Sequence, residues 1–132
     1  MNIESHLESL KESVRKIQEA VPEGLISNQR SIGFHTSAAA ADMFEIILHQ
    51  GNLIDPGFVV KHEWFNSHHK IKEKFSFDFP RKDEIISLVT AIESMRNKLC
   101  YGKRQTEEVL EKIISHFNAL KQIFQEVTTY EL

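Results

Sequence analysis

The fold of this chain is decided by residues 85–102, which read IISLVTAIESMRNKLCYG. Apolar side chains recur there at spacings of three and four residues, the pattern of one stripe along an amphipathic helix. The stripe consists of Ile85, Leu88, Val89, Ile92, Met95 and Leu99. Gly102 follows the last of them and predicts the end of the helix. The stretch therefore predicts a long helix with one buried face.

Two further long helices are predicted before this stretch. The first has a stripe spaced four, three, four and three residues apart, and it ends at Pro22 and Gly24. That stripe is formed by Ile3, Leu7, Leu10, Val14 and Ile17. The second helix is expected over residues 28–49, where the alanines of 38–41 let a neighbouring helix approach closely. Gly51 and Asn52 are expected to close it, because both residue types tolerate a left-handed conformation.

A last long helix is predicted after residue 105. Thr106 is its expected N-cap, and Glu107 and Glu108 are favourably placed at its positive end. Its predicted inner face consists of Val109, Ile113, Phe117, Leu120, Phe124 and Val127. We therefore expect four long helices in total.

The middle of the chain is less regular. Asp55-Pro56 resembles an N-cap followed by proline in a first turn, so a shorter helix is expected over residues 56–74. Residues 75–80 alternate aromatic and polar side chains, but no second strand is available to pair with them. We expect an extended connector that fills the core, with Asp78 capping the next helix and Pro80 in its first turn.

Together these elements predict an all-α protein, an antiparallel up-and-down bundle of four long helices and one shorter helix. A chain of 132 residues with 41% hydrophobic residues is expected to form one domain, residues 1–132. No apolar run approaches the roughly 18 residues that span a bilayer. Residues 1–10 do not resemble a signal peptide, and Cys100 has no second cysteine to pair with. These features favour a cytoplasmic protein without membrane association.

Charge is unevenly distributed along the chain. The formal net charge of −3 argues against a protein wrapped wholly around nucleic acid. Residues 96–104 nevertheless contain Arg96, Lys98, Lys103 and Arg104 and no acid. One basic groove is therefore expected there.

Arg96 is the most informative single residue of the sequence. On a helical wheel it lies roughly 40° from Ile92, which places a guanidinium within the apolar stripe. Burying a cation without a partner is costly, so an acceptor must meet it. Two interpretations stay open: an internal ion pair, with Glu93 or with a carboxylate on another helix, and a ligand for a phosphate or other anion.

Tyr101 follows five positions later, roughly 140° away on a continuous helix. If Gly102 ends the helix, Tyr101 is released from the helical direction and can turn back toward Arg96. The alternative is an aromatic side chain that packs at the end of the helix.

The histidines do not show a metal-ligand spacing. His62-Glu63 begins like a zinc-protease motif, but Asn66 stands where the second histidine is required. We therefore expect all seven histidines to be surface or core residues, with no metal and no cofactor. Cys100 is expected to be a small buried hydrophobe rather than a nucleophile.

The run from Arg96 to Gly102 resembles the signature of HEPN domains (higher eukaryotes and prokaryotes nucleotide-binding), which are bundles of four to five helices. In that family an arginine is followed by a polar residue and, four to six positions after the arginine, by a histidine. Arg96 and Asn97 match the first two positions, whereas Tyr101 stands in place of the histidine. The resemblance covers the bundle and hence most of the chain, but its diagnostic part is short.

The resemblance implies a homodimer with its sites facing a shared cleft, and RNA or nucleotide binding. It implies catalytic positions at Arg96, Asn97 and Tyr101, with Lys98, Lys103 and Arg104 supplying positive charge for nucleic acid. It further implies a toxin-like role beside a minimal nucleotidyltransferase acting as antitoxin.

Two functions follow from these implications. One is metal-free RNA cleavage that leaves 2',3'-cyclic phosphate and 5'-hydroxyl ends. Tyrosine is a poor general base near neutral pH, which favours the other, a non-catalytic bundle dimer that binds a substrate or a partner protein.

Overall fold

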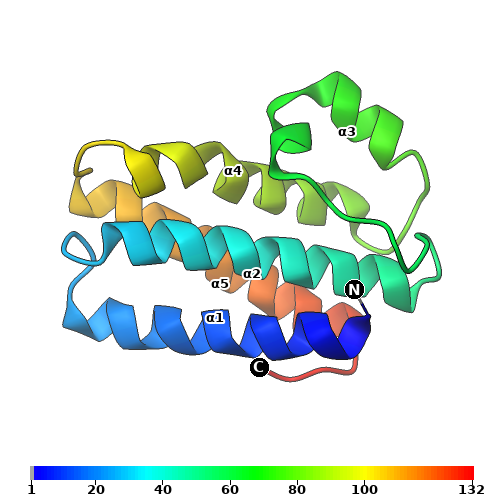
Figure 1. The fold of residues 1–132 in the computed structure, drawn as a ribbon, viewed down its shortest axis with the longest axis horizontal. Helices are drawn as coiled ribbons and strands as arrows, with labels where there is room; N and C mark the ends of the chain where they lie inside the picture. Colours follow the sequence, from blue (N-terminus) through cyan, green and yellow to red (C-terminus); the bar gives the residue numbers. More distant parts are fainter. Residues whose placement is uncertain (1) are drawn as a thin grey trace.

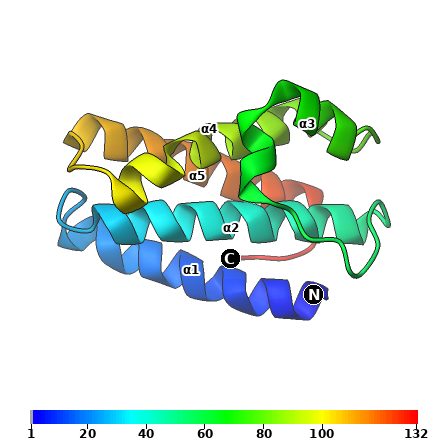
Figure 2. The ribbon, with the colours of Figure 1, turned by 45° about the horizontal axis from the view of Figure 1, so that its top comes forward.

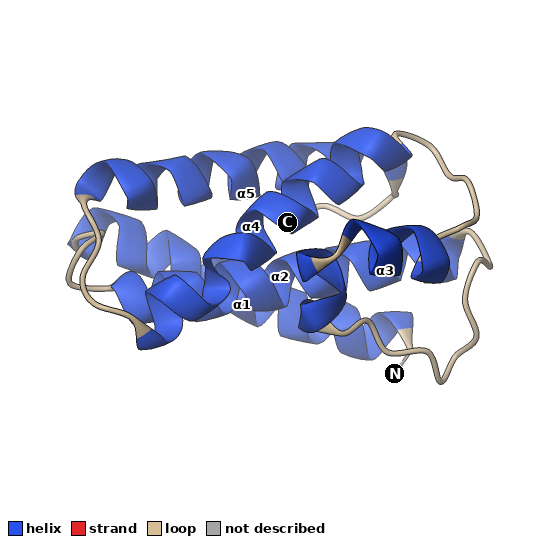
Figure 3. Cartoon of the chain, turned by 90° about the horizontal axis from the view of Figure 1, so that it is seen from above, coloured by secondary structure: helices blue, strands red, loops and turns tan. Residues whose placement is uncertain are grey.

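The computed structural model describes residues 2–132, and every regular element in that range is helical (Figure 3). Four long helices form a bundle in which consecutive helices run in opposite directions (Figure 1). They are α1 (Ile3–Glu23), α2 (Gln29–Gln50), α4 (Lys82–Tyr101) and α5 (Glu107–Val127). A short 3-10 helix, η1 (His62–Asn66), and the seven-residue α3 (His68–Lys74) lie between α2 and α4. The all-helical prediction is confirmed.

Helix α2 is the centre of the bundle, because it packs against α1, α4 and α5. Its buried side chains lie on most of its circumference, as expected for a helix with neighbours on several sides. Gly33 permits a close contact with α4: a Cβ built there would lie 2.6 Å from the Cβ of Leu99. Within the predicted alanine run, Ala39 and Ala40 are fully buried in the core.

The helix ends follow the expected capping chemistry in most places. Thr106 caps α5 by accepting a hydrogen bond from the backbone N–H of Val109. Gly24 ends α1 with a positive φ of 138°. Asn52 adopts the left-handed conformation after α2, with φ 54°, whereas Gly51 does not.

The predicted helix over residues 56–74 is wrong in its first half. Asp55 begins a turn, in which its carbonyl accepts a hydrogen bond from Phe58 N–H, and helical structure starts only at His62. After α2 the chain doubles back along the bundle to η1, which contacts α4 (Figure 2). The prediction for Asp78 is also wrong, since the carboxylate accepts from Phe79 N–H and the N-cap of α4 is Arg81 in the left-handed region.

The connector over residues 75–80 fills the core, as expected. Phe75 is 1% exposed and makes edge-to-face contact with Phe44 of α2, with ring centroids 4.9 Å apart. Phe65 of η1 stacks on Phe75 at 5.7 Å. This aromatic cluster attaches η1 and α3 to the bundle and thereby positions the segment before η1. Among residues 2–132, no helix is both long and apolar enough to cross a membrane.

Candidate functional site

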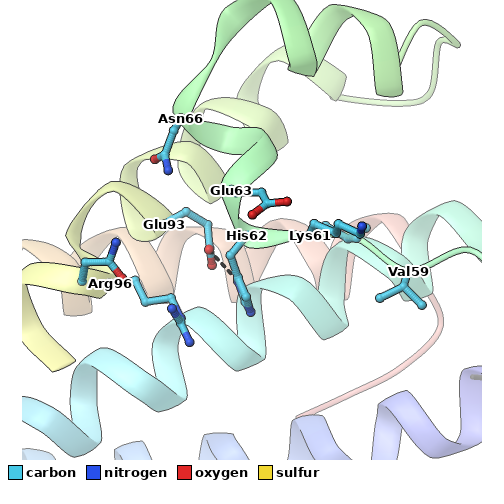
Figure 4. Close-up of a pocket in the computed structure, with 9 residues that line it drawn as sticks. Val59, Lys61, His62, Glu63, Asn66, Glu93 and Arg96 are labelled. Carbon is cyan, nitrogen blue, oxygen red and sulfur yellow. Dashed lines mark hydrogen bonds and ion pairs between the residues drawn. The ribbon is translucent and has the colours of Figure 1, made fainter. Parts of the chain in front are cut away.

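A cavity of about 550 Å³ lies between α4 and the segment that leads into η1 (Figure 4). One wall comes from α4, and the other comes from residues 59–66, which the aromatic cluster holds over the bundle. The lining residues are Val59, Val60, Lys61, His62, Glu63, Asn66, Glu93, Arg96 and Asn97. The cavity therefore contains the first two residues of the predicted motif.

Arg96 lines this cavity and is half-buried. Among residues 2–132, no side chain or carbonyl forms a hydrogen bond or ion pair with its guanidinium. The interpretation of Arg96 as the partner of Glu93 is therefore wrong. The expected place on the apolar side of α4 is confirmed, because Arg96 lies on the helical wheel among the buried residues Ile92, Val89 and Cys100. It is nevertheless only half-buried, because the cavity opens over this part of the helix.

Glu93 is the buried carboxylate of the cavity, with a side chain only 2% exposed. One oxygen, Oε1, accepts a hydrogen bond from Ser37 Oγ on α2 at 2.6 Å. The other, Oε2, lies 2.6 Å from Nδ1 of His62. Both oxygens are thus used in fixing neighbouring side chains, which is how a buried carboxylate is normally satisfied.

His62 is consequently held by its Nδ1 atom, and its side chain is 41% exposed. When Nδ1–H donates to Glu93, the second ring nitrogen, Nε2, carries the lone pair and can accept a proton. Figure 4 shows the His62 and Arg96 side chains in the same cavity, which both residues line. An oriented histidine beside an unpaired arginine is an arrangement suited to a phosphate ester.

We did not identify His62 as part of this site from the sequence, because its partner Glu93 is 31 residues away and no local spacing connects them. The zinc-protease comparison excluded His62 as a zinc ligand but gave no information about which residues surround it.

The remaining predicted site residues lie elsewhere. Tyr101 is the last residue of α4, is 70% exposed, and lines a separate cavity of about 370 Å³ together with Arg30, Lys103 and Arg104. The structure therefore does not bring Tyr101 to Arg96. The backbone at Gly102 is extended rather than left-handed.

The loop after α4 is fixed by Gln29, which is 1% exposed. Its side-chain nitrogen donates to the carbonyls of Leu99 and Lys103, and its oxygen accepts from Gln105 N–H at 2.6 Å. Lys103 and Arg104 are thus presented beside Tyr101. The predicted basic groove is divided, because Lys98 lines a third hollow near Lys112 and His116.

Cys100 is 7% exposed, and burial raises the pKa of its thiol above the usual value. It therefore stays protonated near neutral pH, as expected for a core residue rather than a nucleophile.

Comparison with known proteins gives no relative: no family model, no curated protein and no solved structure matches this chain.

Proposed function

We propose that this chain is a HEPN-like RNA-binding protein and that the cavity between η1 and α4 holds a phosphate group of RNA or of a nucleotide. The observation that carries the proposal is Arg96, a half-buried cation that lines the cavity and has no partner among the described residues. A planar guanidinium with its donors free matches two phosphate oxygens at once.

The surroundings of Arg96 support this function. Lys61 adds a second cation to the cavity, while Asn66 and Asn97 offer amide donors from opposite walls. The nearest buried carboxylate, Glu93, is engaged by Ser37 and His62 and so does not compete for Arg96. A phosphate here meets two positive side chains and neutral amides, with the exposed Glu63 as the remaining acid.

We further propose that His62 takes the role that the family assigns to the motif histidine. Its Nε2 atom accepts the proton of a ribose 2'-hydroxyl, and the 2'-oxygen bonds to phosphorus while Arg96 holds the non-bridging oxygens. The bond from phosphorus to the 5'-oxygen breaks, the 5'-oxygen takes a proton from water, and His62 returns its proton to solvent. The products are a 2',3'-cyclic phosphate and a 5'-hydroxyl, and no metal takes part.

The assembly implied by the same resemblance belongs to this proposal. Two chains form a homodimer, and a minimal nucleotidyltransferase acts as the partner that controls the RNA-binding subunit. Measuring the molecular mass of the purified chain by sedimentation tests the homodimer, and co-purification with a nucleotidyltransferase encoded beside it tests the partner.

RNA binding is tested by fluorescence anisotropy with a short labelled single-stranded RNA, comparing wild type, Arg96→Ala and Arg15→Ala. Arg15 is exposed on α1 outside the cavity, so Arg15→Ala removes the same charge without changing the proposed site. A charge-assisted contact contributes about 1.5–3 kcal/mol, so we expect Arg96→Ala to weaken binding about 10- to 100-fold. The slope of the logarithm of the binding constant against the logarithm of the salt concentration should also fall by about one, the value for one lost phosphate contact. Equal weakening in both variants contradicts the site.

Cleavage is tested with end-labelled RNA in the presence of EDTA. A general base contributes about 10²- to 10⁴-fold, so His62→Gln should slow cleavage at least 100-fold while RNA affinity changes little. The exposed His68→Gln is the matched control and should cleave like wild type. Binding without any turnover supports the non-catalytic function, and absence of RNA and nucleotide binding overturns both.

A further inference from the structure

A second polar cluster lies at the opposite side of α2, where the start of α1 meets the end of α2 (Figure 1). His6 projects from α1, while Asp42, Glu45 and His49 lie on one face of α2 at spacings of three and four residues. None of these residues takes part in the cavity of Arg96 and His62. Glu45 and His49 are four residues apart and therefore share a helix face, whereas His6 comes from a different helix, so no local spacing identifies the cluster.

Three of these side chains converge on one point. His6, Glu45 and His49 each offer a ligand atom, and these atoms all lie within 4.8 Å of one another. Donor atoms that share one cation at about 2.1 Å are separated by roughly 3–4 Å, so only a small adjustment is needed to bind an ion.

The ring nitrogens face this point without hydrogen bonds. The Nε2 atoms of His6 and His49 are buried and have no hydrogen-bond partner among residues 2–132. His6 Nε2 does lie 2.5 Å from Glu45 Oε2, so its one contact is with another member of the cluster. His49 Nε2 has no such contact, and buried nitrogens are almost always paired, so a shared cation would give both nitrogens a partner.

The outer contacts of the cluster match those of a metal centre. Nδ1 of His6 lies 2.8 Å from Asp42 Oδ1, which sets the tautomer that leaves the Nε2 lone pair free. Glu45 Oε1 accepts a hydrogen bond of 2.6 Å from the backbone N–H of Val60. Carboxylate support behind a histidine ligand, and a hydrogen bond to a ligating carboxylate, are typical second-sphere features of such sites.

Charge points to a dication. The side chains of Asp42 and Glu45 are 15% and 6% exposed, and among the described residues their only ion-pair partner is His6. With both histidines neutral, the buried carboxylate of Glu45 faces the point where the ligand atoms meet, and the half-buried Asp42 lies behind His6. Burial raises the pKa of Asp42, so its charge also needs a cation nearby. The alternative, a protonated His6 between the two acids, leaves one negative charge and the His49 nitrogen unsatisfied.

Access is available from the surface. His49 also lines a cavity of about 530 Å³, whose rim includes Glu4 and Asn52. The cluster therefore lies next to a surface opening on the side of His49.

We propose that His6, Glu45 and His49 bind one divalent transition-metal ion, with Zn²⁺ as the best match, and that a water molecule completes its coordination. Two imidazoles and one carboxylate are ligands that Zn²⁺ accepts in four-coordinate sites. The ion ties α1 to α2 and, through Glu45 and Val60, stabilises the segment that carries His62.

The test uses the full chain, freed of metal with a chelator and then titrated with Co²⁺ and Zn²⁺. We expect one ion per chain and intense visible absorption from four-coordinate Co²⁺, which one equivalent of Zn²⁺ abolishes. Saturating Zn²⁺ should raise Tm, because an ion that binds only the folded state stabilises it.

Two variants identify the ligands. His49→Gln is expected to weaken Zn²⁺ binding at least 100-fold, and Asp42→Asn, which alters only the support of His6, about 10- to 100-fold. His68→Gln is the matched control, since His68 and His69 are exposed and adjacent, and it should bind as wild type does. Circular dichroism verifies that each variant is folded. No saturable binding by wild type, or equal weakening in His49→Gln and His68→Gln, overturns the proposal without affecting the proposed RNA function.

Discussion

At the scale of single residues, the cavity depends on Glu93. A carboxylate that is 2% exposed must have both oxygens satisfied, and Ser37 and His62 satisfy one each. Ser37 is itself 1% exposed, and its hydroxyl comes from the central helix, so it connects the site to the core of the bundle. The orientation of His62 is therefore a consequence of core packing rather than of the loop in which it lies.

Ser37→Ala tests this dependence. The variant removes one hydrogen bond to a buried carboxylate, so we expect the free energy of unfolding to fall by about 1.5–3 kcal/mol. Cleavage should fall as well, because Glu93 is then less firmly placed against His62. Ser94→Ala is the matched control, since Ser94 is exposed and bonds only to the carbonyl of Ala91 in its own helix. Urea denaturation measures both variants, and equal stability in the two argues against a structural role for Ser37.

Part of this site follows from the sequence and part does not. Arg96 could be identified because it is a cation within a stretch where apolar residues recur every three or four positions. The contacts of Glu93 with Ser37 and His62 span 56 and 31 residues, and helical periodicity carries no information about such pairs. Tyr101 was linked to Arg96 through the expected helix end at Gly102, and α4 does end there, but the Tyr101 side chain is exposed and lines a different cavity.

At the scale of elements, the contact between α2 and α4 positions Arg96 relative to the core. Gly33 lies within this contact, where an added Cβ would come within 2.6 Å of Leu99 Cβ and 3.3 Å of Cys100 Sγ. The Cβ of Leu99 is fixed to its backbone and cannot rotate away. The two helices must therefore separate if any larger residue replaces Gly33.

Gly33→Ala is expected to lower the free energy of unfolding by about 1–3 kcal/mol, the usual cost of overpacking. This loss outweighs the gain in helix propensity from glycine to alanine, which is at most about 1 kcal/mol. Gly57→Ala is the control, because among the described residues beyond its two chain neighbours no atom lies within 4 Å of the added Cβ. The free energy of unfolding of this variant should be unchanged or raised by less than about 1 kcal/mol. A stabilised Gly33→Ala protein contradicts the close approach of the helices.

Three of the long helices were predictable because each one carries a sustained apolar stripe and clear end signals. Helix α2 is buried on most of its circumference and was indicated instead by its alanine-rich apolar run and by Gly51 and Asn52 at its end. The segment over residues 56–74 was not, because its structure depends on partners far away in the sequence. Phe65 and Phe75 pack on Phe44 of α2, and these contacts, rather than a local period, determine where the chain turns. Asp55-Pro56 is a valid helix signal that this tertiary packing overrides.

At the scale of the whole molecule, the bundle carries two separate polar centres on opposite sides of α2. The cavity with Arg96 and His62 faces η1, and the cluster of His6 and His49 faces α1. Glu45 and Val60 link them, because Val60 donates to Glu45 and also lines the cavity. The proposed metal binding and the proposed RNA binding are therefore separable in principle, and the segment before η1 is common to both.

The proposed homodimer allows a test of whether each active site belongs to one chain. Arg96 and His62 line the same cavity of a single chain, so a mixed dimer of one Arg96→Ala chain and one His62→Gln chain has no intact pair. We therefore expect no recovery of RNA cleavage when the two variants are co-expressed with different tags and purified through both. The control is a mixed dimer of wild type and Arg96→Ala, which keeps one complete cavity and should retain about half of the activity.

Recovery to the level of that control would mean that Arg96 of one chain acts with His62 of the other. In that case the cavity seen within one chain is only half of the reacting site. The absence of recovery, together with activity in the control, assigns both residues to the same subunit and makes the second chain a contributor to RNA placement rather than to the chemistry.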